Sequence, residues 1–220
     1  MFRKIASQFG FAGLAASLAA TLALSAASLP GPRVDEPRSA KSETVVLAGG
    51  CFWGVEAVFD DVKGVSSAVA GYAGGSKANA HYEIVSTGTT GHAESVQVTF
   101  DPSQISFGQL LKIYFSVAHD PTELNRQGPD EGTQYRSEIF YTTDEQKKIA
   151  EAYIQQLDGA KIFHSRIVTK VAPLQGFYRA EEYHQHYVAQ HPNQPYVAYN
   201  DIPKIANLHR EFPQLVKGGK

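Results

Sequence analysis

The sequence predicts an α+β fold: a two-layer sandwich with a mixed, mainly antiparallel sheet and flanking helices. Strand and helix patterns alternate only roughly along the chain. The strand pattern at 94–100 places Val96, Val98 and Phe100 on one face and polar residues on the other, as in a half-buried strand. A parallel doubly wound sheet would need strands that are apolar throughout, so the polar-faced strands argue against it.

The first half of the fold begins with a buried strand, because the apolar run at 44–48 is closed by Gly49 and Gly50. Cys51 opens a helix, since Val55 and Phe59 follow it at helical spacing. The elements predicted next are a strand at 65–72, a short helix at 81–86 and the strand at 94–100.

Two helices in the second half are indicated by capping boxes, in which an N-cap side chain and a side chain three residues later satisfy first-turn amides. The pairs are Ser106 with Gln109 and Thr143 with Gln146. The other elements predicted are strands at 135–141 and 167–171 and a final helix over 179–190, followed by an irregular C-terminal tail.

The N-terminus has the features of an export signal. Arg3 and Lys4 precede an Ala- and Leu-rich block, and residues 23–27 have the small-residue spacing that a signal peptidase needs. We therefore predict a signal peptide at 1–27, a disordered linker at 28–42 and one folded domain at 43–220. This predicts export, to the periplasm in a bacterium; the alternative is an uncleaved membrane anchor through 9–27.

The charge balance argues against a nucleic-acid partner. The formal net charge is −2, and because residues 1–42 contain five basic and two acidic side chains, the remainder carries −5. That remainder has no basic stripe suited to a phosphate backbone.

The only cysteine and the only tryptophan lie together in the stretch GGCFWG, residues 49–54. A thiol in the first turn of a helix is close to free amides and the positive end of the helix dipole, which lower a thiol pKa. We therefore interpret Cys51 as a nucleophile in its thiolate form. The alternative is a small buried hydrophobic residue, as many lone cysteines are.

Glu94 has the same strand parity as Val96, so its carboxylate is predicted to point toward the apolar side. Desolvation there would raise its pKa and let it act as a proton donor near neutrality. The alternative is that Glu94 precedes the strand and is solvated. The long loop 119–134 is rich in turn residues, and loops of this length in compact domains are commonly functional.

Four blocks in the same order resemble the A-type peptide methionine sulfoxide reductases, over nearly all of residues 44–192. They are GGCFWG followed by GYAGG, then TGHAESVQVTFDP, then HDPTELNRQGPDEGTQYRSEIFY, then AEEYHQHY. The resemblance implies reduction of methionine S-sulfoxide, free or in proteins, to methionine through a cysteine sulfenic acid, and so the repair of oxidised proteins.

The resemblance also implies roles for individual residues. Cys51 matches the nucleophile and Glu94 the acid catalyst. The remaining matches are Tyr82 and Tyr135 to the phenols that bind the sulfoxide oxygen, Phe52 and Trp53 to the apolar walls for the methyl group, and Asp130 to a supporting acid.

The chain departs from many members of that family because it has no second cysteine to attack the sulfenic acid. We expect no bound cofactor and an external thiol reductant instead: a thioredoxin-like protein, glutathione or glutaredoxin, or dithiothreitol. Oxidised proteins or free methionine sulfoxide are the expected substrates, and a monomer is expected. No metal is expected, because His184, His186 and His191 do not place two histidines four residues apart on one helix.

Two other functions are compatible with a lone reactive cysteine. One is a cysteine hydrolase that uses His92 or His119 as its base. The other is a non-catalytic redox sensor or binding module in which Cys51 is oxidised only to signal.

Overall fold

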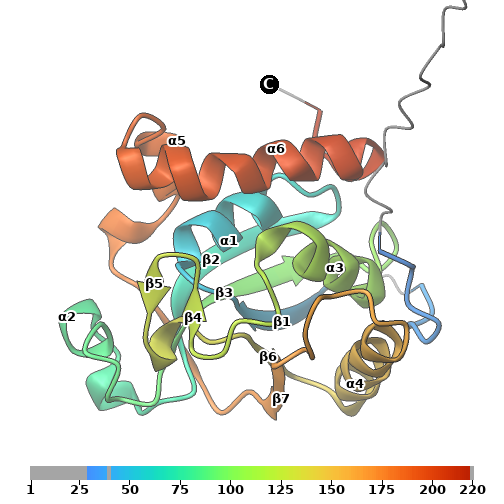
Figure 1. Cartoon of the computed structure of the whole chain (residues 1–220), viewed down its shortest axis with the longest axis horizontal. Helices are drawn as coiled ribbons and strands as arrows, with labels where there is room; N and C mark the ends of the chain where they lie inside the picture. The colour runs from blue at the N-terminus through green and yellow to red at the C-terminus, as the bar shows by residue number, and fades with distance from the viewer. Residues whose placement is uncertain (1–28, 39–40, 219–220) are drawn as a thin grey trace, which may run out of the picture.

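The computed structural model describes residues 29–38 and 41–218, which form one six-stranded sheet with helices packed against it (Figure 1). The strand order is β7-β6-β1-β3-β2-β8, and only the β6–β7 pair is parallel. The strands are β1 (Glu43–Ala48), β2 (Val65–Ala73), β3 (Ala93–Phe100), β6 (Glu138–Tyr141), β7 (Lys170–Pro173) and β8 (Phe177–Arg179). The prediction of a mixed, mainly antiparallel sheet in an α+β fold is confirmed.

Six α-helices occur among the described residues. They are α1 (Phe52–Asp60), α2 (Tyr82–Val85), α3 (Phe107–Ile113), α4 (Asp144–Gly159), α5 (Tyr187–Gln190) and α6 (Ile202–Glu211). The shorter elements are the hairpin strands β4 (Arg126–Gln127) and β5 (Asp130–Glu131), the 3₁₀ turns η1 (Lys77–Asn79), η3 (Thr133–Tyr135), η4 (Glu182–His184) and η6 (Pro213–Leu215), and the π turns η2 (Tyr114–Ala118) and η5 (Val197–Asp201).

The sheet is strongly curled. A flat sheet of six strands would separate its two edge strands by about 24 Å. The chain passes from the end of β7 at Pro173 to the start of β8 at Phe177, a span of at most about 15 Å for an extended chain. The edges must therefore approach each other, and a small apolar cluster fills the inside of the curl, formed by Val46, Ala48, Ala73, Ala93 and Phe140 with Leu174 and Phe177.

The main core lies between the other face of the sheet and the helices. Leu47 of β1 pairs with Val96 of β3, and Val45 pairs with Val98, so these side chains alternate onto the helix-covered face. Helix α1 packs on β2 and β3, and α6 packs on α1 (Figure 1). Cys51 stands at the junction of β1 and α1, at the edge of this core.

Two predicted strands are shifted along the chain. β6 starts at Glu138 rather than at residue 135, because Tyr135 belongs to the turn η3. β7 starts at Lys170 rather than at residue 167, because the Ile167 amide donates to the Asp158 carboxylate, 2.9 Å away, instead of to a strand. In both cases a side-chain or turn contact replaces the first pairing that the apolar pattern suggested.

The predicted helix over 179–190 is wrong. Residues 177–179 form the edge strand β8, and only 187–190 are α-helical. His186 has a left-handed backbone (φ 52°), which no helix continues through. The side-chain amide of Gln185 donates from Nε2 to the Ala70 and Ala180 carbonyls, and its Oε1 accepts from the Ala70 backbone amide. This segment is therefore bonded to β2 instead of continuing a helix.

The C-terminal tail is not irregular. It forms η5 and the ten-residue helix α6, whose Leu208 is fully buried. The sequence does contain a helical signal, because Ile202, Ile205 and Leu208 recur every three residues, but the prediction of an irregular tail did not use it. Helix α6 packs against α1.

Both predicted helix starts are confirmed, with one difference in the second. Ser106 and Gln109 form the full reciprocal capping box. At α4, Thr143 accepts from the Gln146 amide, but the Gln146 side chain accepts from the Thr142 amide at 3.0 Å rather than from Thr143.

The prediction of a disordered linker at 28–42 is wrong for the part that the structure describes. Asp35 accepts from the Ser106 hydroxyl (2.5 Å) and the Gly108 amide (2.9 Å), and Glu36 accepts from the Phe107 amide (2.6 Å). These carboxylates satisfy free amides at the positive end of α3. Tyr153 of α4 donates to the Pro30 carbonyl, which anchors the segment further.

Replacing Asp35 with alanine should lower the free energy of unfolding by about 1 kcal/mol, the usual cost of losing a helix-terminal acceptor. A urea titration measures this as a lower midpoint. Arg38→Ala is the matched control, because the hydrogen bond from the Arg38 guanidinium to the Ser103 carbonyl is exposed and long, at 3.5 Å. Equal midpoints for the native chain and Asp35→Ala would show that this segment does not support α3.

The predicted signal peptide and membrane anchor lie outside the described residues. Among residues 29–38 and 41–218, no helix is both long enough and apolar enough to cross a bilayer.

Candidate active site

All seven predicted site residues line one cavity of about 250 Å³. They come from elements that are distant in the sequence but meet above the start of α1. The lining residues are Cys51, Phe52, Trp53, Tyr82, Glu94, Asp130 and Tyr135, together with Gln194 and Tyr196.

The two glycines before Cys51 allow a loop to approach the thiol's backbone. A Cβ on Gly49 would lie 2.8 Å from Cγ of His119, and a Cβ on Gly50 would lie 2.5 Å from Cγ of Gln127. Gly50 also has a left-handed backbone (φ 86°), which favours glycine. Gln127 lies in β4, and the hairpin β4–β5 delivers Asp130 to the cavity.

Glu94 is inward-pointing and buried, as its strand parity predicts; 3% of its surface is exposed. The Phe52 amide, in the first turn of α1, donates to its Oε2 at 3.1 Å. Burial raises the pKa of Glu94 to about 8, opposed by that amide and by the neighbouring Cys51 thiol. Near neutral pH the carboxyl is thus mostly protonated, and it lines the same cavity as the thiol.

Cys51 does not have the lowered pKa that its position at a helix start predicted. Burial raises the pKa of Cys51 well above 9, and the carboxylates of Glu94 and Asp201 raise it further. The Trp53 amide lowers the pKa, as expected at a helix start, but this effect is smaller than desolvation. The resting group is a neutral thiol that is 7% exposed.

The aromatic wall of the cavity is fixed from behind by the segment around His184. Trp53 donates from Nε1 to Nδ1 of His184 at 3.1 Å and stacks on Tyr187, with ring centroids 3.8 Å apart. The His184 ring also contacts Phe52 and Tyr82. His184 therefore orients three side chains of the wall.

Glu181 connects the sheet to the short helix that carries Tyr82. Its carboxylate accepts from the Tyr72 hydroxyl (2.8 Å) and from the Tyr82 amide at the start of α2 (3.0 Å). Burial raises the pKa of the Tyr82 and Tyr135 phenols. Both hydroxyls stay protonated near neutral pH and can donate into the cavity.

Tyr196 and Gln194 are lining residues that sequence reasoning missed. Tyr196 donates to Asp130 and packs edge-on against Trp53. Its hydroxyl keeps its proton, because burial and nearby anions raise its pKa. No periodic pattern marks Tyr196; a Pro-Tyr pair in a polar stretch is the only sequence signal, and the tail brings it to the cavity through tertiary packing.

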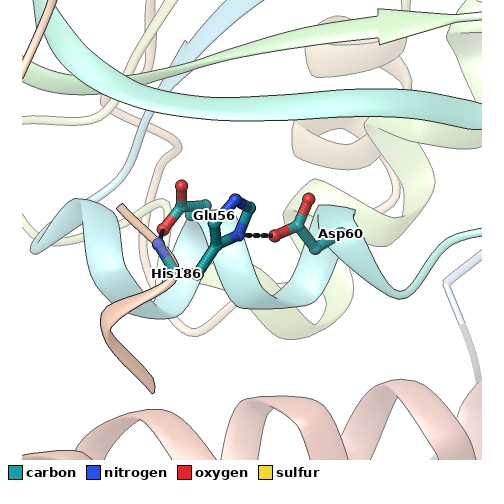
Figure 2. A group of neighbouring side chains, drawn as sticks. All are labelled: Glu56, Asp60 and His186. Carbon is teal, nitrogen blue, oxygen red and sulfur yellow. Dashed lines mark hydrogen bonds and ion pairs between the residues drawn. The ribbon is translucent and has the colours of Figure 1, made fainter. Parts of the chain in front are cut away.

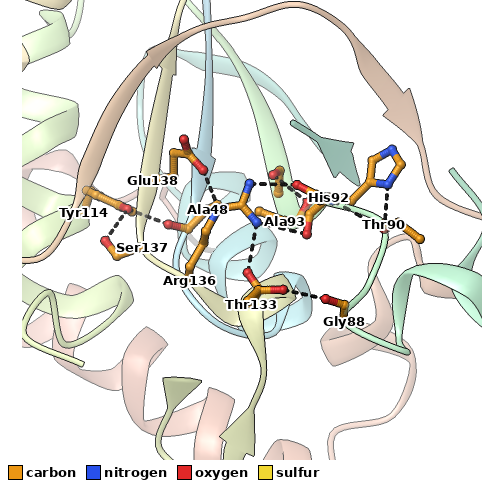
Figure 3. Close-up of polar contacts among 12 residues, drawn as sticks. Ala48, Gly88, Thr90, His92, Ala93, Tyr114, Thr133, Arg136, Ser137 and Glu138 are labelled. Atoms are coloured by element: carbon orange, nitrogen blue, oxygen red, sulfur yellow. Dashed lines mark hydrogen bonds and ion pairs between the residues drawn. The ribbon is translucent and has the colours of Figure 1, made fainter. Parts of the chain in front are cut away.

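Arg136 links two chain segments that carry cavity residues, because it bonds to the backbone just before β3 and to residues on both sides of Tyr135 (Figure 3). Its guanidinium donates to the carbonyls of Gly91, His92 and Thr133 and forms an ion pair with Glu138 at 2.5 Å. The bonds to residues 91 and 92 hold the start of β3, which carries Glu94. The bonds to Thr133 and Glu138 bracket Tyr135 in the same way.

Neither histidine considered as a base lines the cavity. His119 uses both ring nitrogens, with Tyr114 O at 3.2 Å and Ser137 Oγ at 2.7 Å, and burial lowers its pKa to about 3. His92 contacts Thr90 through Nδ1 (2.9 Å), and its Nε2 has no partner among the described residues. The geometry therefore does not support a cysteine hydrolase.

One cluster outside the cavity offers donors of the kind that bind metals. Glu56, Asp60 and His186 place one such atom each within 4.8 Å of one another (Figure 2). His186 Nδ1 lies 2.7 Å from Asp60, and the His186 amide donates to Glu56 at 2.8 Å. The His186 contacts account for Asp60 and for Oε2 of Glu56, whereas Oε1 of Glu56 is buried and has no partner among the described residues.

Comparisons with known proteins agree with the fold. Residues 43–215 match the sequence model of the family described as peptide methionine sulfoxide reductase. Peptide methionine sulfoxide reductase MsrA 2 of Mesorhizobium japonicum is 58% identical over 182 residues, which cover 83% of this chain and 93% of that protein.

Two solved structures are similar at 34% identity. Mxr1 from Saccharomyces cerevisiae in reduced form gives a TM-score of 0.63, covering 74% of this chain and 92% of that one. Methionine sulfoxide reductase A of Corynebacterium diphtheriae gives 0.61, covering 76% and 88%. The chain therefore belongs to the A-type peptide methionine sulfoxide reductases.

Proposed function

We propose that this chain reduces methionine S-sulfoxide, free or in proteins, to methionine with electrons from an external thiol, and so repairs oxidised proteins. The observation that carries the proposal is that the Cys51 thiol and the buried, protonated Glu94 carboxyl line the same aromatic cavity. A sulfoxide needs this combination, because its oxygen leaves only as a proton reaches it.

The cavity suits a small sulfoxide with one apolar and one polar side. Phe52 and Trp53 provide rigid apolar area for the methyl group. Tyr82 and Tyr135 donate hydrogen bonds to the oxygen, where negative charge gathers as the S–O bond breaks. Asp130 supports the polar side by accepting from Tyr196.

The first step converts the thiol and the sulfoxide to a sulfenic acid and a thioether. Glu94 gives its proton to the sulfoxide oxygen and takes the thiol proton, so the carboxyl is regenerated. Two electrons pass from the Cys51 sulfur to the substrate sulfur, and the substrate S–O bond breaks. A new S–O bond forms at Cys51, so the protonated oxygen is transferred there as the sulfenic hydroxyl.

Tyr82→Phe and Tyr135→Phe should each lower kcat/KM for a methionine sulfoxide peptide by about a hundredfold, because each removes one donor to the developing charge. Steady-state assays of the two variants measure the loss. Tyr199→Phe is the matched control, since this tyrosine is 83% exposed and does not line the cavity. Unchanged rates in both cavity variants would remove the phenols from oxygen binding.

Regeneration requires an outside thiol, because the chain has one cysteine. The first thiol attacks the sulfenic acid to give a mixed disulfide and water. A second thiol attacks that disulfide and releases Cys51 with the oxidised reductant. We propose a thioredoxin-like protein as the physiological donor, with glutathione or glutaredoxin as the alternatives; dithiothreitol is expected to serve as the donor in assays.

The location is also a proposal. A leader of residues 1–27 supports export, to the periplasm in a bacterium, with anchoring through 9–27 if the leader is retained. N-terminal sequencing of the protein recovered from the producing cell distinguishes the two. A monomer is proposed as the working form, which light scattering measures.

The direct test of the function supplies peptides carrying the S or the R epimer of methionine sulfoxide, with dithiothreitol, and measures the methionine formed. Reduction of the S epimer alone is expected. Hydrolysis of an ester substrate, or no turnover of either epimer, would contradict the proposal and favour the hydrolase or sensor alternative.

A further inference from the structure

The C-terminal tail places a charged pair against the first turn of α1. Asp201 ends η5 and Lys204 lies in the first turn of α6, with Oδ1 and Nζ 3.3 Å apart. The Asp201 side chain is fully buried, and only 16% of the Lys204 side chain is exposed. A pair this buried is costly to form, so its position needs an explanation other than surface solubility.

The pair lies on Gly54, three residues after Cys51. A Cβ on Gly54 would lie 2.2 Å from Asp201 Oδ1 and 2.7 Å from Lys204 Nζ. Glycine is thus required for both charges to contact this turn of α1. Neither residue lines the cavity, so the pair adjoins the thiol's helix turn from outside the substrate space.

The charges of the pair act on the thiol with opposite signs. The Asp201 carboxylate raises the pKa of Cys51 and the Lys204 ammonium lowers it. The other titratable groups that face the thiol are Glu94, Asp130 and the phenols of Tyr82, Tyr135 and Tyr196. None of these groups carries a positive charge. The positive charge that lowers the pKa of Cys51 therefore comes from Lys204.

We propose that the Asp201–Lys204 pair modulates the ionisation of Cys51: Lys204 favours the thiolate, Asp201 opposes it, and both act through the thiol rather than on the substrate. Asp201 and Lys204 are thus positioning residues for the reaction. Their effect on sulfoxide reduction rests on the proposed function, whereas their effect on thiol ionisation does not.

Lys204 gives the tail a role in a chain that has no second cysteine. A lower thiol pKa assists attack on the sulfoxide. It also makes Cys51 a better leaving group when the second thiol attacks the mixed disulfide. Lys204 therefore bears on both halves of the proposed cycle.

The test is the pH dependence of Cys51 alkylation by iodoacetamide, followed by intact-protein mass. Cys51 is the only cysteine, so alkylation of a thiol reports the ionisation of Cys51 alone. Lys204→Met should move the midpoint up by about one pH unit, and Asp201→Asn should move it down by a similar amount. The double variant should return close to the native midpoint, and Lys204→Arg should stay near it.

Lys148→Met is the matched control, because Lys148 is an exposed lysine on α4, and its midpoint should equal the native one. Opposite shifts in the two single variants support the proposal, since damage to packing has no reason to follow the sign of the charge. Shifts in the same direction, or no shift in either variant, would overturn it. Circular dichroism confirms that each variant is folded.

The same variants separate this proposal from the proposed function. If the alkylation midpoints move as expected but the native chain reduces no sulfoxide, the pair governs the thiol and the proposed function fails. If the native chain reduces sulfoxide and the midpoints do not move, the function stands and the role of the pair is refuted.

Discussion

Replacing Cys51 with serine is expected to abolish methionine formation. A serine hydroxyl is a much weaker nucleophile and cannot accept the oxygen as a sulfenic acid, so the rate should fall on the order of 10⁴-fold or more. The assay is methionine release from a sulfoxide peptide with dithiothreitol present.

Serine fits the site, since Cys51 is small and 7% exposed. Thermal unfolding of Cys51→Ser should therefore be close to that of the native chain, which separates lost chemistry from lost folding. A variant that is folded and retains a tenth or more of the native rate would exclude Cys51 as the nucleophile.

Glu94→Gln is expected to lower kcat/KM by about 10²- to 10⁴-fold, the usual contribution of a positioned general acid. Glutamine retains an oxygen that can accept from the Phe52 amide, so the loss reports mainly the missing proton. Because the pKa of Glu94 is about 8, the native carboxyl carries its proton below pH 8 and loses it above. The difference between variant and native chain should be greatest below pH 8 and narrow above it.

The difference in stability between Glu94→Gln and the native chain should change with pH in a predictable direction. The pKa of Glu94 is raised from 4.5 to about 8 on folding, so its favourable contribution is complete below pH 4.5 and is lost as the pH rises to about 8. Glu94→Gln does not ionise and should gain stability relative to the native chain in that range, measured by urea midpoints. A constant rate ratio and a constant stability difference from pH 5 to 9 would exclude the raised pKa.

The sequence allowed a site residue to be predicted where a local pattern determines the direction in which its side chain points. The parity of Glu94 with Val96 and Val98 correctly indicated a buried carboxyl. The resemblance to the family predicted Tyr82 and Asp130 as site residues, although no local pattern relates them to Cys51. Both line the same cavity as Cys51.

Other features depended on tertiary contacts that a sequence pattern does not contain. The sign of the Cys51 pKa shift was wrong because desolvation by the whole fold exceeds the local effect of one helix start. The helix at 179–190 was wrong because Gln185 bonds to β2, and Tyr196 was missed because only the docked tail brings it to Trp53. Asp35 was assigned to a linker since its helix partner lies about seventy residues away.

The most direct test of the reaction is a single turnover without reductant. The native chain, first reduced and freed of thiol, is mixed with excess methionine S-sulfoxide peptide, and methionine and intact-protein mass are measured together. We predict about one methionine per chain, a protein heavier by one oxygen with that oxygen on Cys51, and renewed turnover only after a thiol is added. Continued methionine release without thiol, or release with no change in the mass of the protein, would contradict the account.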